Sequence, residues 1–327
     1  MVSSDFVTLT SESCERAFAP LAERSCWAAP ADPAVFARVW ATVEATGFLD
    51  ILTMDDSPWA ERVAATFAIL RQAGRCLLSA PLGETMAARM LARSAGLAIS
   101  DGPAALAIGD GERFTRVPYG RFAKALICGI APENWRLSVD GMSVTQGANL
   151  ASEPRDDLMT SAKPERDWIP RLAEDPMLWG LAMRAAQIAG ALEGMLALTV
   201  DYARTRKQFG RPIGQFQAVQ QNLSVFAGQT AAASTAAAYA FSAAGTAQFR
   251  PAALAAAVRC GEAAGISTAI AHQTLGAIGI THEHDLRFYT ARLHSWRTEY
   301  QASAAPQQLG HWAAAHGADG LWAAITT

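Results

Sequence analysis

The sequence predicts a mainly α protein with a small β domain in its middle. Two long regions carry apolar residues at steps of three and four, one before about residue 100 and one after about residue 176. Between them, short apolar runs and alternation replace this spacing. We therefore expect an N-terminal helical domain over 1–103, a reduced β domain over 104–165 and a C-terminal helical bundle over 170–327.

Composition excludes several classes of protein. The chain has 327 residues, 51% of them hydrophobic, and a formal net charge of −3. Its 27 basic and 30 acidic residues are nearly balanced and do not indicate nucleic-acid binding. We expect no membrane span, because no uncharged apolar run approaches about 18 residues. Five scattered cysteines are typical of reduced, buried thiols, and no export signal opens the sequence. A cytoplasmic protein is expected.

Three helices are expected in the N-terminal region. An apolar stripe begins at Val35 and continues to Phe48, and similar spacing covers 60–78 and 85–97. Prolines stand where helices should begin or loops should run, at Pro30, Pro33, Pro58 and Pro81.

The middle region has strand character. Apolar runs at 104–108 and 123–130 predict short strands, and alternation on both sides of Asp140-Gly141 predicts a hairpin there. The polar, proline-containing stretch 153–171 is typical of a linker.

Alanine-rich helical spacing then returns over 178–199, over 216–230 and from Pro251 to about His272. Small side chains let helices approach closely, which suits a tight antiparallel bundle.

The turn between the first two of these helices concentrates positive charge. Residues 202–217 read YARTRKQFGRPIGQFQ, in which Gly210 and Pro212 end one helix and reset the chain. The cations either oppose a helix dipole or bind an anion, for which Gln217 would add an amide. These cations are Arg204, Arg206, Lys207 and Arg211.

Two blocks of sequence resemble the acyl-CoA dehydrogenase family. The pattern Y-A-x-x-R-x-x-F-G-x-P-I-x-x-x-Q at 202–217 is similar to the signature of the family's C-terminal domain. The block QTLGAIGITHE at 273–283 is similar to the family's Gln-x-x-Gly-Gly-x-Gly segment. The resemblance is strong over about 176–300 and weak elsewhere.

The resemblance implies the fold and a cofactor. In that family an N-terminal helical domain, a middle β domain and a C-terminal four-helix bundle bind FAD across a subunit interface. Arg206 would bind the FAD pyrophosphate of a neighbouring subunit, and Phe209 and Gln217 would line the cofactor. Four residues would lie along its adenosine half: Gln273, Leu275, Gly276 and Ala277, the last in place of a second glycine.

The resemblance also implies the reaction, which is α,β-dehydrogenation of an acyl-CoA thioester. A carboxylate takes the α-proton, a hydride goes to the flavin, and an electron-transfer acceptor reoxidises it. Hydrogen-bond donors must stabilise the developing enolate in a site that excludes water.

The catalytic base does not match the family. Of the two positions that hold the base in different branches, one corresponds to Tyr300 and the other to Gly180. Either the chain lacks its own base, or Glu299, displaced by one residue, serves as the base.

The middle region also lacks the family's flavin-contacting Thr-Glu-Pro and Trp-x-Thr/Ser motifs. Such absences are similar to short subunits that degrade steroids and related side chains in bacteria, where α2β2 assemblies pair a base-bearing subunit with one that lacks the base. The run THEHDL at 281–286 is similar to those subunits. We therefore expect a homo- or hetero-oligomeric FAD enzyme for a bulky acyl-CoA. The alternative is a flavin-free scaffold, and no metal site is expected.

Overall fold

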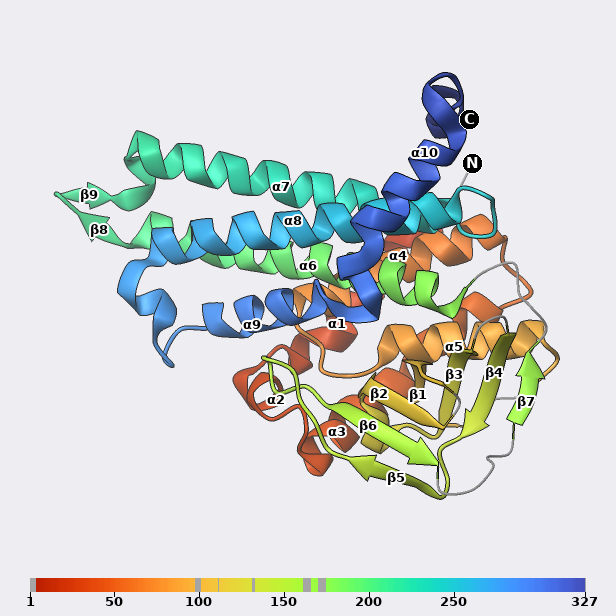
Figure 1. The fold of residues 1–327 in the computed structure, drawn as a ribbon. Helices are drawn as coiled ribbons and strands as arrows, with labels where there is room; N and C mark the ends of the chain where they lie inside the picture. Colours follow the sequence, from red (N-terminus) through yellow and green to blue (C-terminus); the bar gives the residue numbers. More distant parts are fainter. Residues whose placement is uncertain are drawn as a thin grey trace.

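The computed structural model of the chain describes residues 4–97, 101–110, 112–130, 133–160, 166–169 and 175–326. Long antiparallel helices form one end of the molecule, two small sheets form the opposite side, and N-terminal helices lie between them (Figure 1). The main hydrophobic core joins the helices, and a smaller core separates the sheets. The prediction of a mainly α fold with a small β part is confirmed.

Five helices precede the sheets, and they include the three that the sequence predicted. Pro33 opens the third helix, where the Asp32 carboxylate accepts hydrogen bonds from two free backbone N–H groups at 2.9 and 3.0 Å. The helices are α1 (Ser4–Phe18), α2 (Arg24–Ala28), α3 (Pro33–Ala45), α4 (Trp59–Arg75) and α5 (Leu82–Ser94), with short 3-10 turns η1 (Ala19–Leu21) and η2 (Phe48–Thr53).

Four helices build the bundle and a fifth leaves it. The three predicted bundle helices are confirmed as α6 (Pro176–Thr205), α7 (Gln217–Ser242) and α8 (Phe249–Leu275), followed by α9 (Leu286–Trp296) and α10 (Ala305–Thr326). Between α6 and α7 lies a two-stranded hairpin, β8 (Lys207–Gln208) and β9 (Arg211–Pro212), which projects beyond the bundle in Figure 1. Short 3-10 segments are η4 (Ile213–Gln215), η5 (Gly276–Ile280) and η6 (Glu299–Ala304).

Glycines allow α4 and α6 to cross in close contact. A Cβ atom on Gly74 would lie 2.0 Å from the backbone oxygen of Gln187, and one on Gly190 would lie 1.7 Å from that of Arg71. No side chain fits at such distances, so the bundle is locked to the N-terminal helices at this crossing.

The described strands between residues 104 and 169 form two sheets rather than one. The four-stranded sheet has the order β1-β3-β4-β7, with β1 and β3 parallel, and the three-stranded sheet has the order β2-β6-β5. The strands are β1 (Ala104–Ile108), β2 (Arg113–Pro118), β3 (Ala125–Ile130), β4 (Glu133–Ser138), β5 (Met142–Thr145), β6 (Arg155–Thr160) and β7 (Arg166–Ile169).

Alternation along β1 and β3 divides the two cores. Leu106 and Ile127 belong to the helical core, whereas Ala107 and Leu126 belong to the core between the sheets. Because successive side chains of a strand point to opposite faces, the four-stranded sheet lies between the helices and the second sheet.

Two predictions for the middle region were wrong. Asp140-Gly141 does form a turn, but β4 and β5 on its two sides belong to different sheets, so the chain changes sheets there instead of forming a hairpin. The expected linker over 153–171 contains β6 and β7. Its polar residues were misleading because several are buried and paired. The division at 1–103, 104–165 and 170–327 stays a prediction, and β7 lies past its second limit.

The helices α6 and α8 pass a length and hydropathy test for membrane spans, with 72% and 56% of the tested windows buried. Core helices of folded domains pass the same test, so this is weak evidence, and the expected absence of a membrane span stays a prediction. All five cysteines lie within the described residues, where they are buried and form no disulfide, as predicted.

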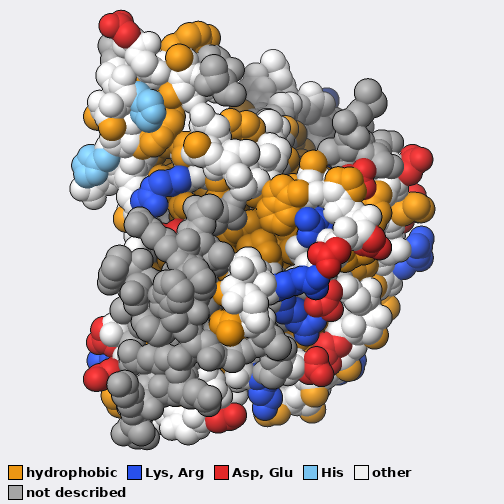
Figure 2. All heavy atoms as spheres, turned by 90° about the vertical axis from the view of Figure 1, so that its right-hand side faces the viewer, with side chains coloured by type: hydrophobic (Ala, Val, Ile, Leu, Met, Phe, Trp, Pro, Cys, Tyr) orange, Lys and Arg blue, Asp and Glu red, His pale blue; other side chains and the backbone are white. Residues whose placement is uncertain are grey.

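The helix α10 lies at the top of Figure 1, where the Gln248 side chain, just before α8, donates to the Ala324 carbonyl at 3.0 Å, and it changes direction at Gly317, where φ is 64°. Figure 2 shows the face that lies on the right-hand side of Figure 1. Hydrophobic side chains gather at its middle, with charged side chains beside them. Trp322 and Ile325 of α10 are exposed. The C-terminal segment therefore adds apolar surface outside the core.

Replacing Gly190 by alanine should destabilise the protein by about 1–3 kcal/mol, because the new methyl group would overlap the α4 backbone. Urea unfolding followed by circular dichroism measures the change. The matched control is Gly228→Ala in α7, where an added Cβ meets nothing within 4 Å. That variant should gain about 0.5–1 kcal/mol from helix propensity. Equal stability of the two variants would contradict the tight crossing.

Candidate functional site

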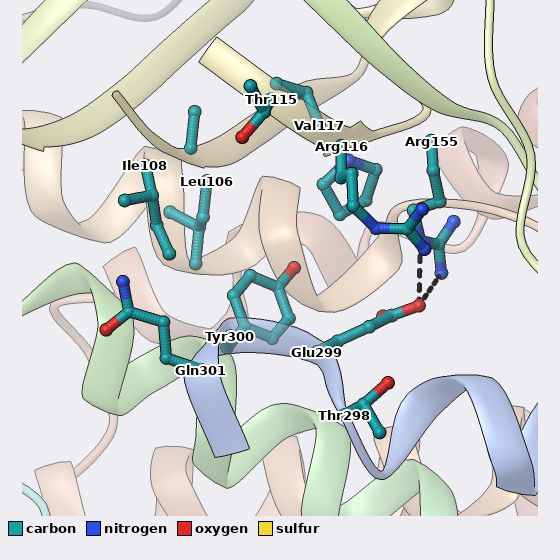
Figure 3. Close-up of a pocket in the computed structure, with 12 residues that line it drawn as sticks. Leu106, Ile108, Thr115, Arg116, Val117, Arg155, Thr298, Glu299, Tyr300 and Gln301 are labelled. Carbon is teal, nitrogen blue, oxygen red and sulfur yellow. Dashed lines mark hydrogen bonds and ion pairs between the residues drawn. The ribbon is translucent and has the colours of Figure 1, made fainter. Parts of the chain in front are cut away.

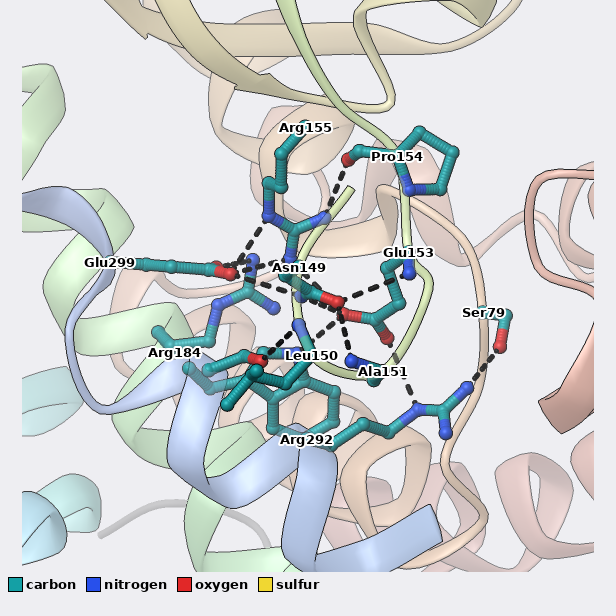
Figure 4. A network of polar contacts seen from close by, with 12 residues as sticks. Ser79, Asn149, Leu150, Ala151, Glu153, Pro154, Arg155, Arg184, Arg292 and Glu299 are labelled. Carbon is teal, nitrogen blue, oxygen red and sulfur yellow. Dashed lines mark hydrogen bonds and ion pairs between the residues drawn. The ribbon is translucent and has the colours of Figure 1, made fainter. Parts of the chain in front are cut away.

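A network of buried charges joins the three parts of the molecule (Figure 4). It contains three carboxylates and three guanidinium groups, so its formal charges balance. The members are Glu84 on α5, Glu153 before β6, Arg155 on β6, Arg184 on α6, Arg292 on α9 and Glu299 at the start of η6. Buried charges persist only when they are paired and hydrogen-bonded, and each of these has a partner of opposite sign.

Glu153 lies at the centre of the network with its side chain 2% exposed. It accepts hydrogen bonds from Arg292 Nε at 3.1 Å, Arg155 Nη2 at 3.1 Å and Trp296 Nε1 at 2.8 Å. Asn149 adds another at 2.8 Å. Burial by itself would raise the pKa of Glu153, but Arg292, Arg155 and Arg184 outweigh it and lower the pKa to about 2.

Glu299 is held between two arginines. Its Oε1 lies 2.7 Å from Arg155 Nη2 and accepts a hydrogen bond from Arg155 Nε at 2.8 Å, and its Oε2 lies 2.8 Å from Arg184 Nη2. Its side chain is 9% exposed. The Oε2 contact is an ion pair without hydrogen-bond alignment, so this oxygen keeps an unused acceptor position.

The two positions that correspond to the family's alternative bases touch each other. A Cβ atom on Gly180 would lie 2.5 Å from Cδ1 of the Tyr300 ring, so the ring fills the space that a side chain on α6 would need. The Tyr300 hydroxyl donates to Glu84 Oε1 at 2.7 Å. Burial and the Glu84 carboxylate raise the pKa of Tyr300 well above 10, which keeps the phenol protonated.

A cavity of about 260 Å³ lies between the β domain and the segment that follows α9 (Figure 3). One wall is apolar and comes mostly from β1 and β2. The opposite wall is polar and consists of Thr298, Glu299, Tyr300 and Gln301, and Tyr300 and Gln301 both have positive φ, at 53° and 58°. Two adjacent left-handed residues are costly, which is typical of functional segments.

Arg206, Phe209 and Gln217 lie at the far end of the bundle, around the projecting hairpin, and face solvent. Phe209 is 90% exposed, and with Gly210 it forms a two-residue turn in which both residues have positive φ. Arg206 uses its backbone N–H to end α6 by donating to Tyr202. A cation, an aromatic ring and an amide are thus presented outward together.

The second block ends at the same end of the bundle. Gln273 and Ala277 are exposed, whereas Leu275 is buried and anchors the end of α8. Gly276 has a φ of 63°, and a Cβ there would meet nothing within 4 Å, so its backbone is open to a ligand. Gln273, Gly276, Ala277 and the hairpin are exposed at the same end of the bundle, and we refer to them together as the exposed half-site.

Glu84, Glu153, Arg155, Arg184 and Arg292 were not predicted as site residues. Arg184 stands in the middle of an apolar helix, and this was a usable signal, because a charge on a buried face needs a partner. Glu153 and Arg155 fell in the stretch that composition assigned to a linker.

Part of the chain matches known proteins in sequence. Residues 171–298 match the family profile described as "Acyl-CoA dehydrogenase, C-terminal domain". The chain is similar to the acyl-CoA dehydrogenase IpdE2 of Mycobacterium tuberculosis, with 40% identity over 125 residues that span 38% of each protein. It is 33% identical to IpdE2 of Mycolicibacterium smegmatis over 171 residues, which span 48% of this chain and 51% of that protein.

Two solved structures share the whole fold. The structure described as "Tcur3481-Tcur3483 steroid ACAD G363A variant" has a TM-score of 0.81 at 20% identity, covering 97% of this chain and 100% of that one. The ChsE4-ChsE5 complex from Mycobacterium tuberculosis has a TM-score of 0.75 at 20% identity, covering 96% and 97%. The predicted resemblance to the acyl-CoA dehydrogenase family is confirmed over residues 171–298, and the chain spans only about 38–51% of the length of the two IpdE2 relatives.

Replacing Glu153 by glutamine should cost about 3–5 kcal/mol at pH 7, because the buried guanidinium groups of Arg155 and Arg292 would lose a counter-charge. The folded-state pKa of about 2 lies below the ordinary 4.5, so ionised Glu153 favours folding above pH 4.5, and this contribution of about 3 kcal/mol is lost as the pH falls toward 2. Urea unfolding at pH 7, 4 and 3 tests both effects.

The variant should show a flatter pH dependence than the parent protein over that range. The control is Glu12→Gln, which removes an exposed helix pair with Arg16 and should change stability by about 0.5 kcal/mol or less. Parallel pH curves for the Glu153 variant and the parent protein would refute the role of this carboxylate.

Proposed function

We propose that this chain is a subunit of an FAD-dependent acyl-CoA dehydrogenase and works with a second chain that supplies the catalytic base. The match to the acyl-CoA dehydrogenase family supports an oxidoreductase role. The observation that carries the proposal is the contact between Gly180 and Tyr300, because neither base position holds a carboxylate and the two occupy the same space.

The alternative within the family is that Glu299 acts as the base of a homo-oligomer. Glu299 lines the cavity, which favours this alternative. Its two arginine partners oppose it, because both carboxylate oxygens already lie against guanidinium nitrogens, at 2.7 Å from Arg155 and 2.8 Å from Arg184. The pairing therefore favours a positioning role for Glu299.

The exposed half-site at the end of the bundle fits FAD. Arg206 is proposed to pair with the pyrophosphate, Phe209 and Gln217 to line the cofactor, and the 273–277 segment to contact its adenosine half. When bound, FAD supplies the hydride-accepting chemistry of the family. The contribution of this chain is to orient the dinucleotide and to shield it from water through the projecting hairpin.

A bulky acyl-CoA, such as a steroid derivative, is the proposed substrate class, and an electron-transfer acceptor is the proposed oxidant. One structural relative is described as a steroid ACAD and another as a complex of two differently named chains. Both descriptions name two chains, which supports a heteromer, and the α2β2 composition is part of the proposal. They apply to those proteins, and for this chain they are part of the proposal, as is a cytoplasmic location.

Dehydrogenase activity should require two different chains. We expect the purified chain to show no turnover of a steroid acyl-CoA, and a complex co-expressed with a base-bearing dehydrogenase subunit to be yellow and active. Absorbance near 450 nm and reduction of an artificial electron acceptor measure flavin and turnover. Full turnover by this chain alone, abolished by Glu299→Gln, would establish the homo-oligomer instead. Colourless protein in both forms would favour a scaffold.

Replacing Arg206 by alanine should weaken flavin retention in the assembled complex. An arginine–phosphate contact contributes about 1.5–3 kcal/mol, so the dissociation constant should rise roughly ten- to hundredfold. Flavin content after dialysis is the measurement. Arg250→Ala is the matched control, because that arginine pairs with Gln308 near the start of α8. Equal flavin loss in both variants would argue against a specific contact at Arg206.

A further inference from the structure

A bulge in β2 directs Arg116 to the cavity between the β domain and η6. The pairing of β2 with β6 shifts between Phe114 and Val117, which leaves Thr115 and Arg116 as the bulge. Arg116 has a φ of 53°, and its backbone N–H donates to Asp157 Oδ1 at 2.9 Å. Bulges redirect side chains, and here both bulge residues line the cavity (Figure 3).

Arg116 gives the cavity an unbalanced positive charge. Of the charged residues that line it, Arg155 and Glu299 are paired with each other at 2.7 Å. The Arg116 guanidinium has neither an ion pair nor a hydrogen bond with any described residue of the chain. The buried network has equal numbers of positive and negative groups, so Arg116, an exposed side chain at the edge of the cavity, is an additional cation outside that balance.

The other lining residues define the rest of the ligand. An apolar wall stands opposite polar groups from Thr298 and Gln301, and Thr115 adds a hydroxyl group from the β2 side. The volume of about 260 Å³ is near the lower end for small-ligand pockets, about 300 Å³, so it suits a compact group and is too small for a whole coenzyme A ester. The apolar wall consists of Leu106, Ala107, Ile108, Val117 and Pro118.

We propose that this cavity binds a carboxylate carried on a compact apolar group, and that Arg116 pairs with that carboxylate. A guanidinium group presents two parallel N–H donors to a carboxylate, and the wall from β1 buries the apolar body. The inference rests on the proposed function in one respect, the molecule that carries the carboxylate. That molecule would be the acyl-CoA substrate, and the carboxylate would be a second acidic group separate from its thioester. Arg116 is then a specificity-determining residue.

The test compares cyclohexanecarboxylate with the neutral cyclohexanecarboxamide, each titrated into the full chain at low salt and followed by NMR. The acid should bind about tenfold more tightly than the amide. Arg116→Gln should remove that preference, and Arg116→Lys, which keeps the charge, should retain part of it. Arg113→Gln is the matched control, because Arg113 is on the same strand, pairs with Asp157 at 3.4 Å and does not line the cavity.

Equal binding of the acid and the amide to the unmodified chain would overturn the proposal, whether or not any variant folds. An equal loss in the Arg113 and Arg116 variants would also overturn it, because it would indicate a general charge effect. Neither flavin nor turnover is needed in this experiment. A colourless, inactive complex that still prefers the acid would therefore reject the proposed function and leave this site intact. A yellow, active complex that binds the acid and the amide equally would support the proposed function and overturn this site.

Discussion

The pairing of Glu153 with Arg155 and Arg292 is the interaction on which the assembly of the three parts depends. These groups come from the start of the second sheet and from α9, and the network extends through Arg184 to Glu84 on α5. Hydrophobic contacts are tolerant of small shifts, whereas a buried ion pair is favourable only at one distance and orientation. The network therefore fixes how the sheets and the bundle meet, and with them the position of the cavity.

The same network explains why the segment after α9 has its unusual backbone. Glu299 turns toward Arg155 and Arg184, and the next residue, Tyr300, reaches Glu84 from a left-handed conformation. Conformational strain at Tyr300 and Gln301 is offset by these buried contacts. The resemblance to the acyl-CoA dehydrogenases predicts a catalytic carboxylate at one of these two positions, Gly180 and Tyr300, and here a glycine and a phenol occupy them.

Helices were predictable because their signal is local. The spacing in α4, α6 and α8 and the YARTRKQFGRPIGQFQ block could be recognised without knowing any distant contact. The division into two sheets was not predictable, because an Asp-Gly turn is the same whether β4 continues into its own sheet or into the next one. The buried charge network could not be predicted for a related reason. Glu84 and Arg184, like Glu153 and Arg292, are about 100 or more residues apart in the sequence, and only the fold brings them together. Composition treated Glu153 and Arg155 as solvated loop residues.

The hairpin β8–β9 exposes an aromatic ring that a lone folded chain would normally bury. An exposed apolar side chain on a projecting finger is a liability for solubility, and it is tolerated when another molecule covers it. If the proposed second chain covers this finger, excess synthesis of this polypeptide would leave the ring uncovered and would favour aggregation and proteolysis. Balanced synthesis of the two chains would then follow from the geometry of one small turn.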